Sequence, residues 1–284
     1  MQFEFPGSLG LPDGRYLARI EAEASGQRVL VVETLAASPP PRRRRRRPQQ
    51  VEPGKEPGTV PLTRITAVRA EEPFESDDDA ARWLENAVGS EETIDAAVAD
   101  GIGLLNLALH ANAAAGADPL GTEVSATRAA TVRIGHGSGK EVAAGRFSAG
   151  REVDVRSAAS RRRMREEELR PQERLAAVLG GREQLDACET LLLRTRADLD
   201  AGRRREAALQ LRVALEALLV ELDGALADPG HEKDMVELQE RRGEAGEAAN
   251  AALRGDLPLD DERNVTELTE TCERVLRRRR VLRG

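Results

Sequence analysis

Residues 187–219 read ACETLLLRTRADLDAGRRREAALQLRVALEALL and carry the clearest helical pattern of the chain. Leucines and small residues recur at three- and four-residue spacing on both sides of Gly202. This spacing places apolar side chains on one face of a helix, and the glycine between the two runs allows a tight turn. The stretch therefore predicts two antiparallel helices that pack along their apolar faces.

Helical patterns continue on both sides of this hairpin. A short helix that ends at Gly180 and Gly181 is predicted before it, and a further helix pair is predicted at residues 232–253 and 261–282. Residues 171–284 are therefore expected to form an all-α helical bundle. Its predicted contact residues, either as core or as a seam for a partner, are four leucines of the second hairpin helix: Leu211, Leu215, Leu218 and Leu222.

The hairpin resembles a tetratricopeptide helix pair over about one repeat. Ala197 precedes Gly202 at the turn, and GRRREAALQLRVALE matches the Gly, Glu-Ala and later Ala-Leu-Glu positions of that motif, although Arg204 replaces the usual aromatic residue. The resemblance implies a protein-binding helical surface and names no ligand. A generic alanine-rich hairpin is the alternative. Because a single unit cannot bury both faces of a solenoid, neighbouring helices must complete the core.

The first 150 residues predict a small α+β domain with one sheet and two helices. Residues 15–35 alternate apolar and charged residues around a Ser-Gly turn, which is typical of a β-hairpin, and residues 63–71 predict a third strand. Residues 129–147 predict another strand that enters a glycine-rich loop and opens a short helix. The order of the strands does not follow from the sequence.

Two helices are expected within this domain. Ser76 or Asp77 can cap the first, because the acidic run that follows suits the positive end of a helix. Trp83, the single tryptophan, is expected to pack against a neighbour such as Phe74. Residues 91–115 predict a longer helix with one apolar face, and His110 at the edge of that face is expected to lie near the surface.

The composition is acidic and poor in aromatic residues. The net charge is −7, and aromatic residues make up 2% of the 284 residues. Cores must therefore consist of aliphatic and small side chains, which suits closely spaced helices. Cys188 and Cys272 lie in helical patterns and are expected as small core residues rather than as a disulfide. No secretory signal is visible, so a cytoplasmic location is expected.

Basic residues concentrate in segments that lack apolar periodicity. Residues 36–60 hold 7 basic and 2 acidic residues, a net charge of +5, and predict a disordered proline-rich insertion. Residues 151–170 hold 7 basic and 5 acidic residues, a net charge of +2, and predict a connector. Arginine runs indicate a tether for nucleic acid or another polyanion, and the alternative is a solvated linker beside acidic domains. The predicted polyanion-binding residues are Arg42, Arg43, Arg44, Arg45, Arg46, Arg47, Arg277, Arg278, Arg279 and Arg280.

The loop GHGSGK at residues 135–140 is the candidate for binding a small molecule. Glycines let backbone amides approach an anion, and a lysine can neutralise it. The predicted phosphate-binding residues are Gly135, Gly137, Gly139 and Lys140, and His136 between them can act as a general acid or base. The spacing matches neither the Walker nor the dinucleotide-binding pattern, and a hairpin turn with glycine at positive φ is the alternative.

The sequence shows no catalytic constellation, metal-ligand spacing or cofactor motif. We therefore expect a non-enzymatic cytoplasmic interaction or scaffold protein that acts through its C-terminal bundle, on a protein partner or on itself. A nucleic-acid-binding accessory protein is the first alternative, and a nucleotide- or phosphate-binding protein is the second. The most apolar window, residues 101–116, is judged too short and too polar to cross a bilayer, so no membrane contact is expected.

Overall fold

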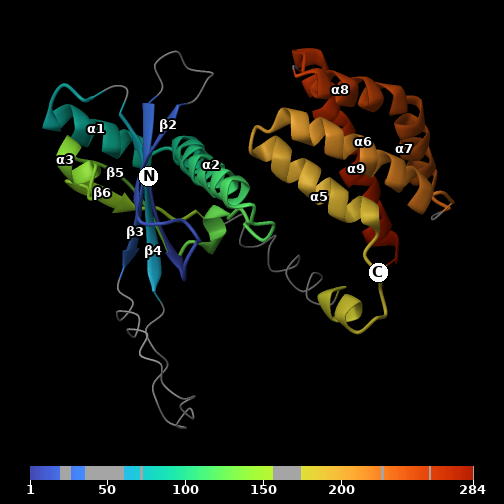
Figure 1. Ribbon diagram of the computed structural model, residues 1–284, viewed down its shortest axis with the longest axis horizontal. Helices are drawn as coiled ribbons and strands as arrows, with labels where there is room; N and C mark the ends of the chain where they lie inside the picture. Colours follow the sequence, from blue (N-terminus) through green and yellow to red (C-terminus); the bar gives the residue numbers. More distant parts are fainter. Residues whose placement is uncertain are drawn as a thin grey trace, which may run out of the picture. The chain divides into compact units, whose positions relative to one another are not determined.

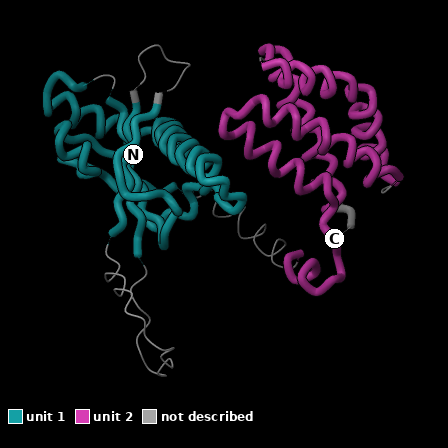
Figure 2. The backbone as a smooth tube through the Cα atoms, in the orientation of Figure 1, with its two compact units in different colours: residues 1–163 teal, residues 164–284 magenta. Residues whose placement is uncertain are grey.

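The computed structural model describes residues 1–19, 27–35, 61–70, 73–155, 174–224, 227–255 and 257–283. The chain divides into two compact units, Met1–Arg163 and Met164–Gly284, which Figure 2 distinguishes by colour. This division falls inside the segment predicted as a connector. The predicted insertion at residues 36–60, and the connector from residue 156 onward, lie outside the described residues.

Unit 1 is built on a six-stranded antiparallel sheet in the order β2-β3-β4-β1-β5-β6. The predicted hairpin and third strand are confirmed as β2, β3 and β4, and the strand before the glycine-rich loop is confirmed as β5. Two strands were not predicted, β1 at the centre and β6 at the edge. The bounds are β1 (Gln2–Pro6), β2 (Gly14–Arg19), β3 (Gln27–Leu35), β4 (Leu62–Arg69), β5 (Thr131–His136) and β6 (Ala149–Glu152).

Helices α1 (Asp77–Val88) and α2 (Glu91–Gly116) share one apolar core with the sheet (Figure 1). The predicted cap of α1 is Ser76, whose side chain accepts a hydrogen bond from the Asp79 amide at 3.1 Å. Gly101 lets α2 approach β1, because a Cβ there would lie 2.8 Å from Cε2 of Phe3. Two short elements, η1 (Ala126–Arg128) and α3 (Gly139–Val142), flank β5.

The face of the sheet opposite this core carries a cross-strand ladder of charges. The register aligns Glu33, Arg64 and Glu4 on neighbouring strands. The Glu4 carboxylate accepts hydrogen bonds from Arg64 at 2.9 Å and from Arg133 at 3.0 Å. Burial raises the pKa of Glu4, but the hydrogen bonds from the two arginines outweigh burial and lower the pKa overall. The ladder therefore fixes the central strand to its neighbours on both sides.

Unit 2 is a bundle whose core draws on all of its long helices. The predicted hairpin is confirmed as α5 and α6, and Gly202 in the turn between them has φ +71°. Residues 174–179 form the predicted short helix. The bounds of the long helices are α5 (Ala187–Asp200), α6 (Arg204–Glu221), α7 (Pro229–Glu240), α8 (Arg242–Arg254) and α9 (Leu259–Arg283).

The single helix predicted at residues 232–253 is wrong, because the chain breaks at Arg241 into α7 and α8. Arg241 has φ −86° and ψ 3°, and its guanidinium bonds Glu244 at 2.9 Å and Glu267 at 3.3 Å. The change of direction lets the alanine face of α8 pack on α6 while α7 packs on α9. The apolar periodicity continues through the break, so it did not reveal the turn.

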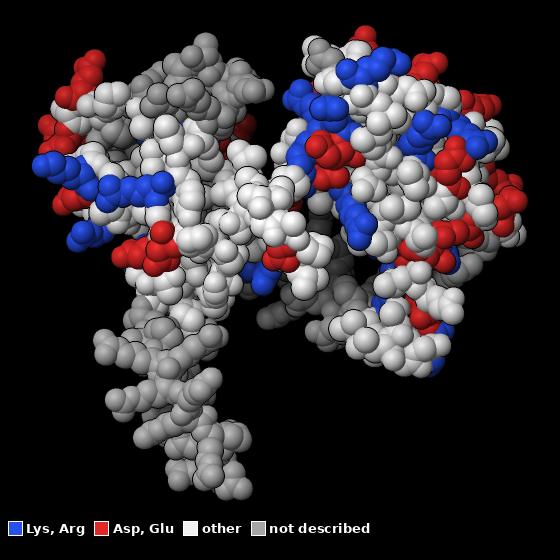
Figure 3. All heavy atoms as spheres, viewed as in Figure 1, with Lys and Arg blue, Asp and Glu red and all other residues white. Residues whose placement is uncertain are grey.

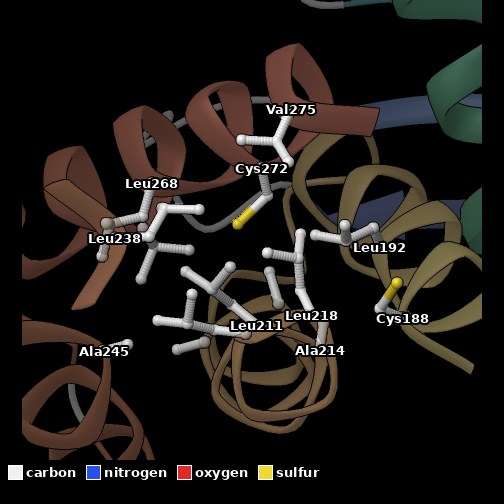
Figure 4. Close-up of a cluster of buried hydrophobic side chains, with 14 of the residues drawn as sticks. Cys188, Leu192, Leu211, Ala214, Leu218, Leu238, Ala245, Leu268, Cys272 and Val275 are labelled. Carbon is white, nitrogen blue, oxygen red and sulfur yellow. The ribbon is translucent and has the colours of Figure 1, made fainter. Parts of the chain in front are cut away.

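The four predicted contact leucines of α6 belong to the interior. Leu211, Leu215, Leu218 and Leu222 are 0–1% exposed, and Figure 4 shows Leu211 and Leu218 facing side chains of other helices. Helix α9 closes the bundle by packing on the other four long helices. The predicted partner seam is therefore the chain's own core, because α6 is covered by its neighbours along this face.

Glu4→Gln tests the charge ladder. A group whose pKa is lowered in the folded state stabilises the fold above its unfolded pKa and loses that contribution as the pH falls through the folded value. We expect the variant to lose about 1–3 kcal/mol at neutral pH, and the loss to shrink below about pH 4. Urea unfolding followed by Trp83 fluorescence measures it. The exposed control Glu85→Gln should have little effect, and a pH-independent loss would contradict the argument.

Leu218→Ala tests the assignment of this leucine to the core. The deletion leaves a cavity among packed helices, so the free energy of unfolding should fall by about 2–5 kcal/mol in urea titrations followed by circular dichroism. The control is Val220→Ala on the same helix, where the side chain is 78% exposed and the change should stay below about 0.5 kcal/mol. Equal effects of the two variants would show that Leu218 is not in the core.

Both thiols should be inert in the folded chain. Cys188 and Cys272 are 0% exposed and lie in the core of the bundle (Figure 4). Burial raises the pKa of both, that of Cys272 to about 12, and a hydrogen bond to Glu221 adds to the rise at Cys188. At about pH 8 a thiol-specific chromogenic reagent should label neither cysteine in the native protein and both in denaturant. Rapid labelling of the native protein would contradict this burial.

Candidate functional site

Two glycines of the predicted phosphate loop, Gly135 and Gly137, serve close packing of the chain around β5 and β6. A Cβ on Gly135 would collide with the carbonyl oxygen of Ala149, and one on Gly137 would lie 2.9 Å from the Ser148 amide nitrogen. Neither glycine has a positive φ; in this region of the described chain only Gly145 does, at +73°. Gly135 and Gly137 are therefore required because a side chain would collide with the neighbouring backbone, and not because they cradle an anion or adopt a positive φ.

The donors of this loop are already used by a carboxylate of the chain. The hydroxyl groups of Ser138 and Ser148 donate to Oε2 of Glu141 at 3.0 and 2.9 Å. These bonds lower the pKa of Glu141 and keep a negative charge where a phosphate would need donors. Lys140 is exposed, and a Cβ on Gly139 would meet open space. The four predicted phosphate-binding residues therefore do not converge on one anion.

His136 belongs to an aromatic cluster. Its ring meets Phe74 edge-on with centroids 6.2 Å apart, and Phe74 lies 5.3 Å from Trp83. The predicted pairing of Trp83 with Phe74 is confirmed. The buried Nε2 of His136 has no hydrogen-bond partner among the described residues. Within the same part of the chain, no group of three or more His, Cys, Asp or Glu residues can hold a metal ion.

The arginines predicted at the end of α9 bind acidic residues of unit 2. Arg278 lies 2.7 Å from Asp234, Arg279 bonds Asp186, and Arg280 lies 3.6 Å from Glu189. Only Arg277 of the four is exposed without an ion pair in the described residues. Figure 3 shows basic and acidic side chains interspersed on the visible face of this unit. The run therefore ties α9 to α5 and α7 rather than forming an open basic patch.

The other predicted polyanion site lies outside the described residues. It consists of Arg42, Arg43, Arg44, Arg45, Arg46 and Arg47. Its role as a tether stays a prediction.

An uncharged surface lies on the outward side of α2, which we call the outer face of α2. The opposite side packs on the sheet through Val98, Leu105 and Leu109. No charged residue occurs between Asp100 and Asp118. In Figure 3 the surface over the position of α2 in Figure 1 is largely white. The outer face comprises Ala96, Ala99, Gly103, Leu107, His110, Ala111 and Ala114, which are exposed except for the partly exposed Gly103.

The judgement that this segment is too short for a membrane needs correction. The helix begins at Glu91 and has 26 residues, so by length and composition it can span a bilayer, as no other helix in the described residues can. In this fold 28% of its most apolar window is buried inside unit 1. A core helix of a folded domain meets the same criterion, and the absence of membrane contact stays a prediction.

Comparison with protein-family models, curated proteins and solved structures finds no match for this chain. The tetratricopeptide resemblance of residues 187–219 is neither supported nor opposed by these comparisons.

The sequence did not single out the outer face of α2. The signal was present, because a stretch of 17 residues from 101 to 117 without charge exceeds what one buried helix face requires. Which of its apolar residues stay exposed depends on how α2 lies on the sheet. Leu107, 49% exposed, differs from the buried Leu105 only through that placement.

Gly137→Ala tests the steric origin of the loop glycines. The added methyl group must displace the Ser148 backbone, so the fold should lose about 1–3 kcal/mol. Gly139→Ala is the matched control, because its methyl group enters open space and stability should be unchanged. Thermal unfolding of both variants, with and without inorganic phosphate, provides the measurement. A phosphate-dependent stabilisation that Lys140→Ala removes would restore the anion-binding interpretation.

Proposed function

We propose that the chain is a non-enzymatic interaction protein whose contact surface is the outer face of α2. The observation that carries this proposal is an exposed helical face without charged residues over its C-terminal half, with Leu107 at its centre. Charged residues make up 33% of the sequence, but none lies between Asp100 and Asp118. An uncharged exposed face in such a chain is typical of a surface that another molecule covers.

The residue types of this face favour association. Alanine and glycine lose no side-chain conformational entropy when they become buried, and they let another backbone approach closely. Leu107 adds a large apolar side chain that is only half covered by its own unit. Burying it removes apolar surface from water at about 25 cal/mol per Å². No ion has to be desolvated at the centre of the contact, which avoids the main cost of burying polar surface.

The contact surface is thus proposed on unit 1 rather than on the C-terminal bundle. The leucines expected as core or as a partner seam fill the interior of unit 2, and Arg278, Arg279 and Arg280 bind acidic residues of its other helices. These seven residues therefore support the fold of unit 2. In the described part of the chain, the outer face of α2 is exposed rather than packed against another element.

Leu107→Cys provides a direct test, because the two natural cysteines are buried and should not react. A photoactivatable cross-linker attached at position 107 of the full chain should give discrete covalent adducts in an extract of the source cells. The same cross-linker attached to Val220→Cys, an exposed position of unit 2, should give none of the adducts that position 107 gives. If position 107 gives no adduct in the extract or in the purified protein, the proposed function is wrong.

A further inference from the structure

We infer that the partner of the outer face of α2 is a second copy of this chain, packed antiparallel about a two-fold axis that passes between Gly103 and Leu107. This inference rests on the proposed function, because it names the partner of the same surface. A two-fold contact is self-complementary: if one residue meets another across the axis, the reverse pair forms as well.

The outer face has a projecting side chain and a position without a side chain at the spacing that a two-fold contact needs. Leu107 projects and is 49% exposed. Gly103, one helical turn earlier, has no side chain, and a Cβ built there meets no atom within 4 Å. If the two-fold axis passes midway between these residues, each Leu107 packs against Gly103 of the other copy. A large side chain then fills the space left by a glycine, as close helix packing requires.

The same axis pairs small residues in the flanking layers. Antiparallel packing brings Ala96 to the level of Ala114 in the second copy, and Ala99 to the level of Ala111. It also brings His110 to the level of Asp100, whose side chain is 27% exposed and which already binds Arg28 and Arg69 of its own chain. A neutral imidazole can donate a further hydrogen bond to that carboxylate. Neighbouring layers therefore hold no pair of large side chains and no pair of like charges.

The charges of α2 favour an antiparallel over a parallel arrangement. All acidic residues of the helix lie in its first ten residues: Glu91, Glu92, Asp95 and Asp100. Parallel packing would bring these groups of two acidic chains together and would place Leu107 against Leu107. Antiparallel packing separates the two acidic groups to opposite ends, where of their members only Glu92 comes to the level of an acidic residue, Asp118, and it opposes the helix dipoles. Two copies with a net charge of −7 each can approach most closely where charge is absent.

The expected dimer is weak. One helix pair of this length buries no more than the roughly 1,200 Å² at which stable protein interfaces begin. Association should therefore depend on concentration in the micromolar range or above. Salt should not weaken it, since no ion pair crosses the centre of the contact and screening reduces the repulsion between two chains of net charge −7.

Sedimentation velocity of the purified full chain at increasing concentration tests the inference. The natural protein should shift from monomer towards dimer, and Leu107→Glu should lower the association constant by about a hundredfold or more by placing a carboxylate in the contact. Gly103→Leu should also stay monomeric, because the new side chain occupies the space that Leu107 of the other copy would fill. Its fold should be intact, since the new side chain enters open space. Val220→Glu, at an exposed position of α6, should dimerise like the natural protein.

The register is tested by oxidation of mixed cysteine variants. Chains with Gly103→Cys and chains with Leu107→Cys should form the mixed disulfide in preference to either like pair. Preference for the like pairs would indicate parallel packing and overturn the inferred arrangement.

A natural protein that stays monomeric at every concentration would overturn the inference altogether. In that case, adducts of the position-107 probe with another protein in the extract would still support the proposed function. Failure of the inference and failure of the proposed function are therefore distinguishable.

Discussion

Close approach of small residues is the constraint on which both units depend. With 2% aromatic residues the chain has few large side chains to fill a core. In unit 2 the helices therefore come close enough for alanines to meet, and Ala207, Ala208, Ala214, Ala248 and Ala252 are all 0% exposed. In unit 1 the large Phe3 is accommodated by Gly101 on α2. Where a small residue lies on an outward face, as Gly103 does, a helix of another molecule can approach equally closely.

Several arginines in the described part of the chain join elements rather than display charge. Arg64 and Arg133 hold Glu4 on the central strand, and Arg196 binds Glu273 through two hydrogen bonds of 2.8 Å. The planar guanidinium can span neighbouring strands or helices and bond carboxylates at two points. A run of arginines in a helix is thus not by itself an open patch: Arg278, Arg279 and Arg280 each bind a different acidic residue.

The sequence predicted most elements because their patterns are local. Three- and four-residue spacing located α5, α6 and α9, alternation located β2 to β4, and serine followed by acidic residues located the start of α1. It missed β1, which is defined by pairing with strands far away in the chain, and β6, which has only four residues. It also missed the break at Arg241, since the apolar periodicity runs through the turn.

The sequence by itself determined that the chain has an α+β part followed by a helical bundle, because periodicity and capping depend on near neighbours. Only the tertiary structure decided which apolar and charged residues remain available for contact. Leu211 and Leu107 both follow helical spacing, yet one is 0% and the other 49% exposed. Exposure depends on which face of a helix the rest of the chain covers. That is set by long-range packing, which local spacing does not encode.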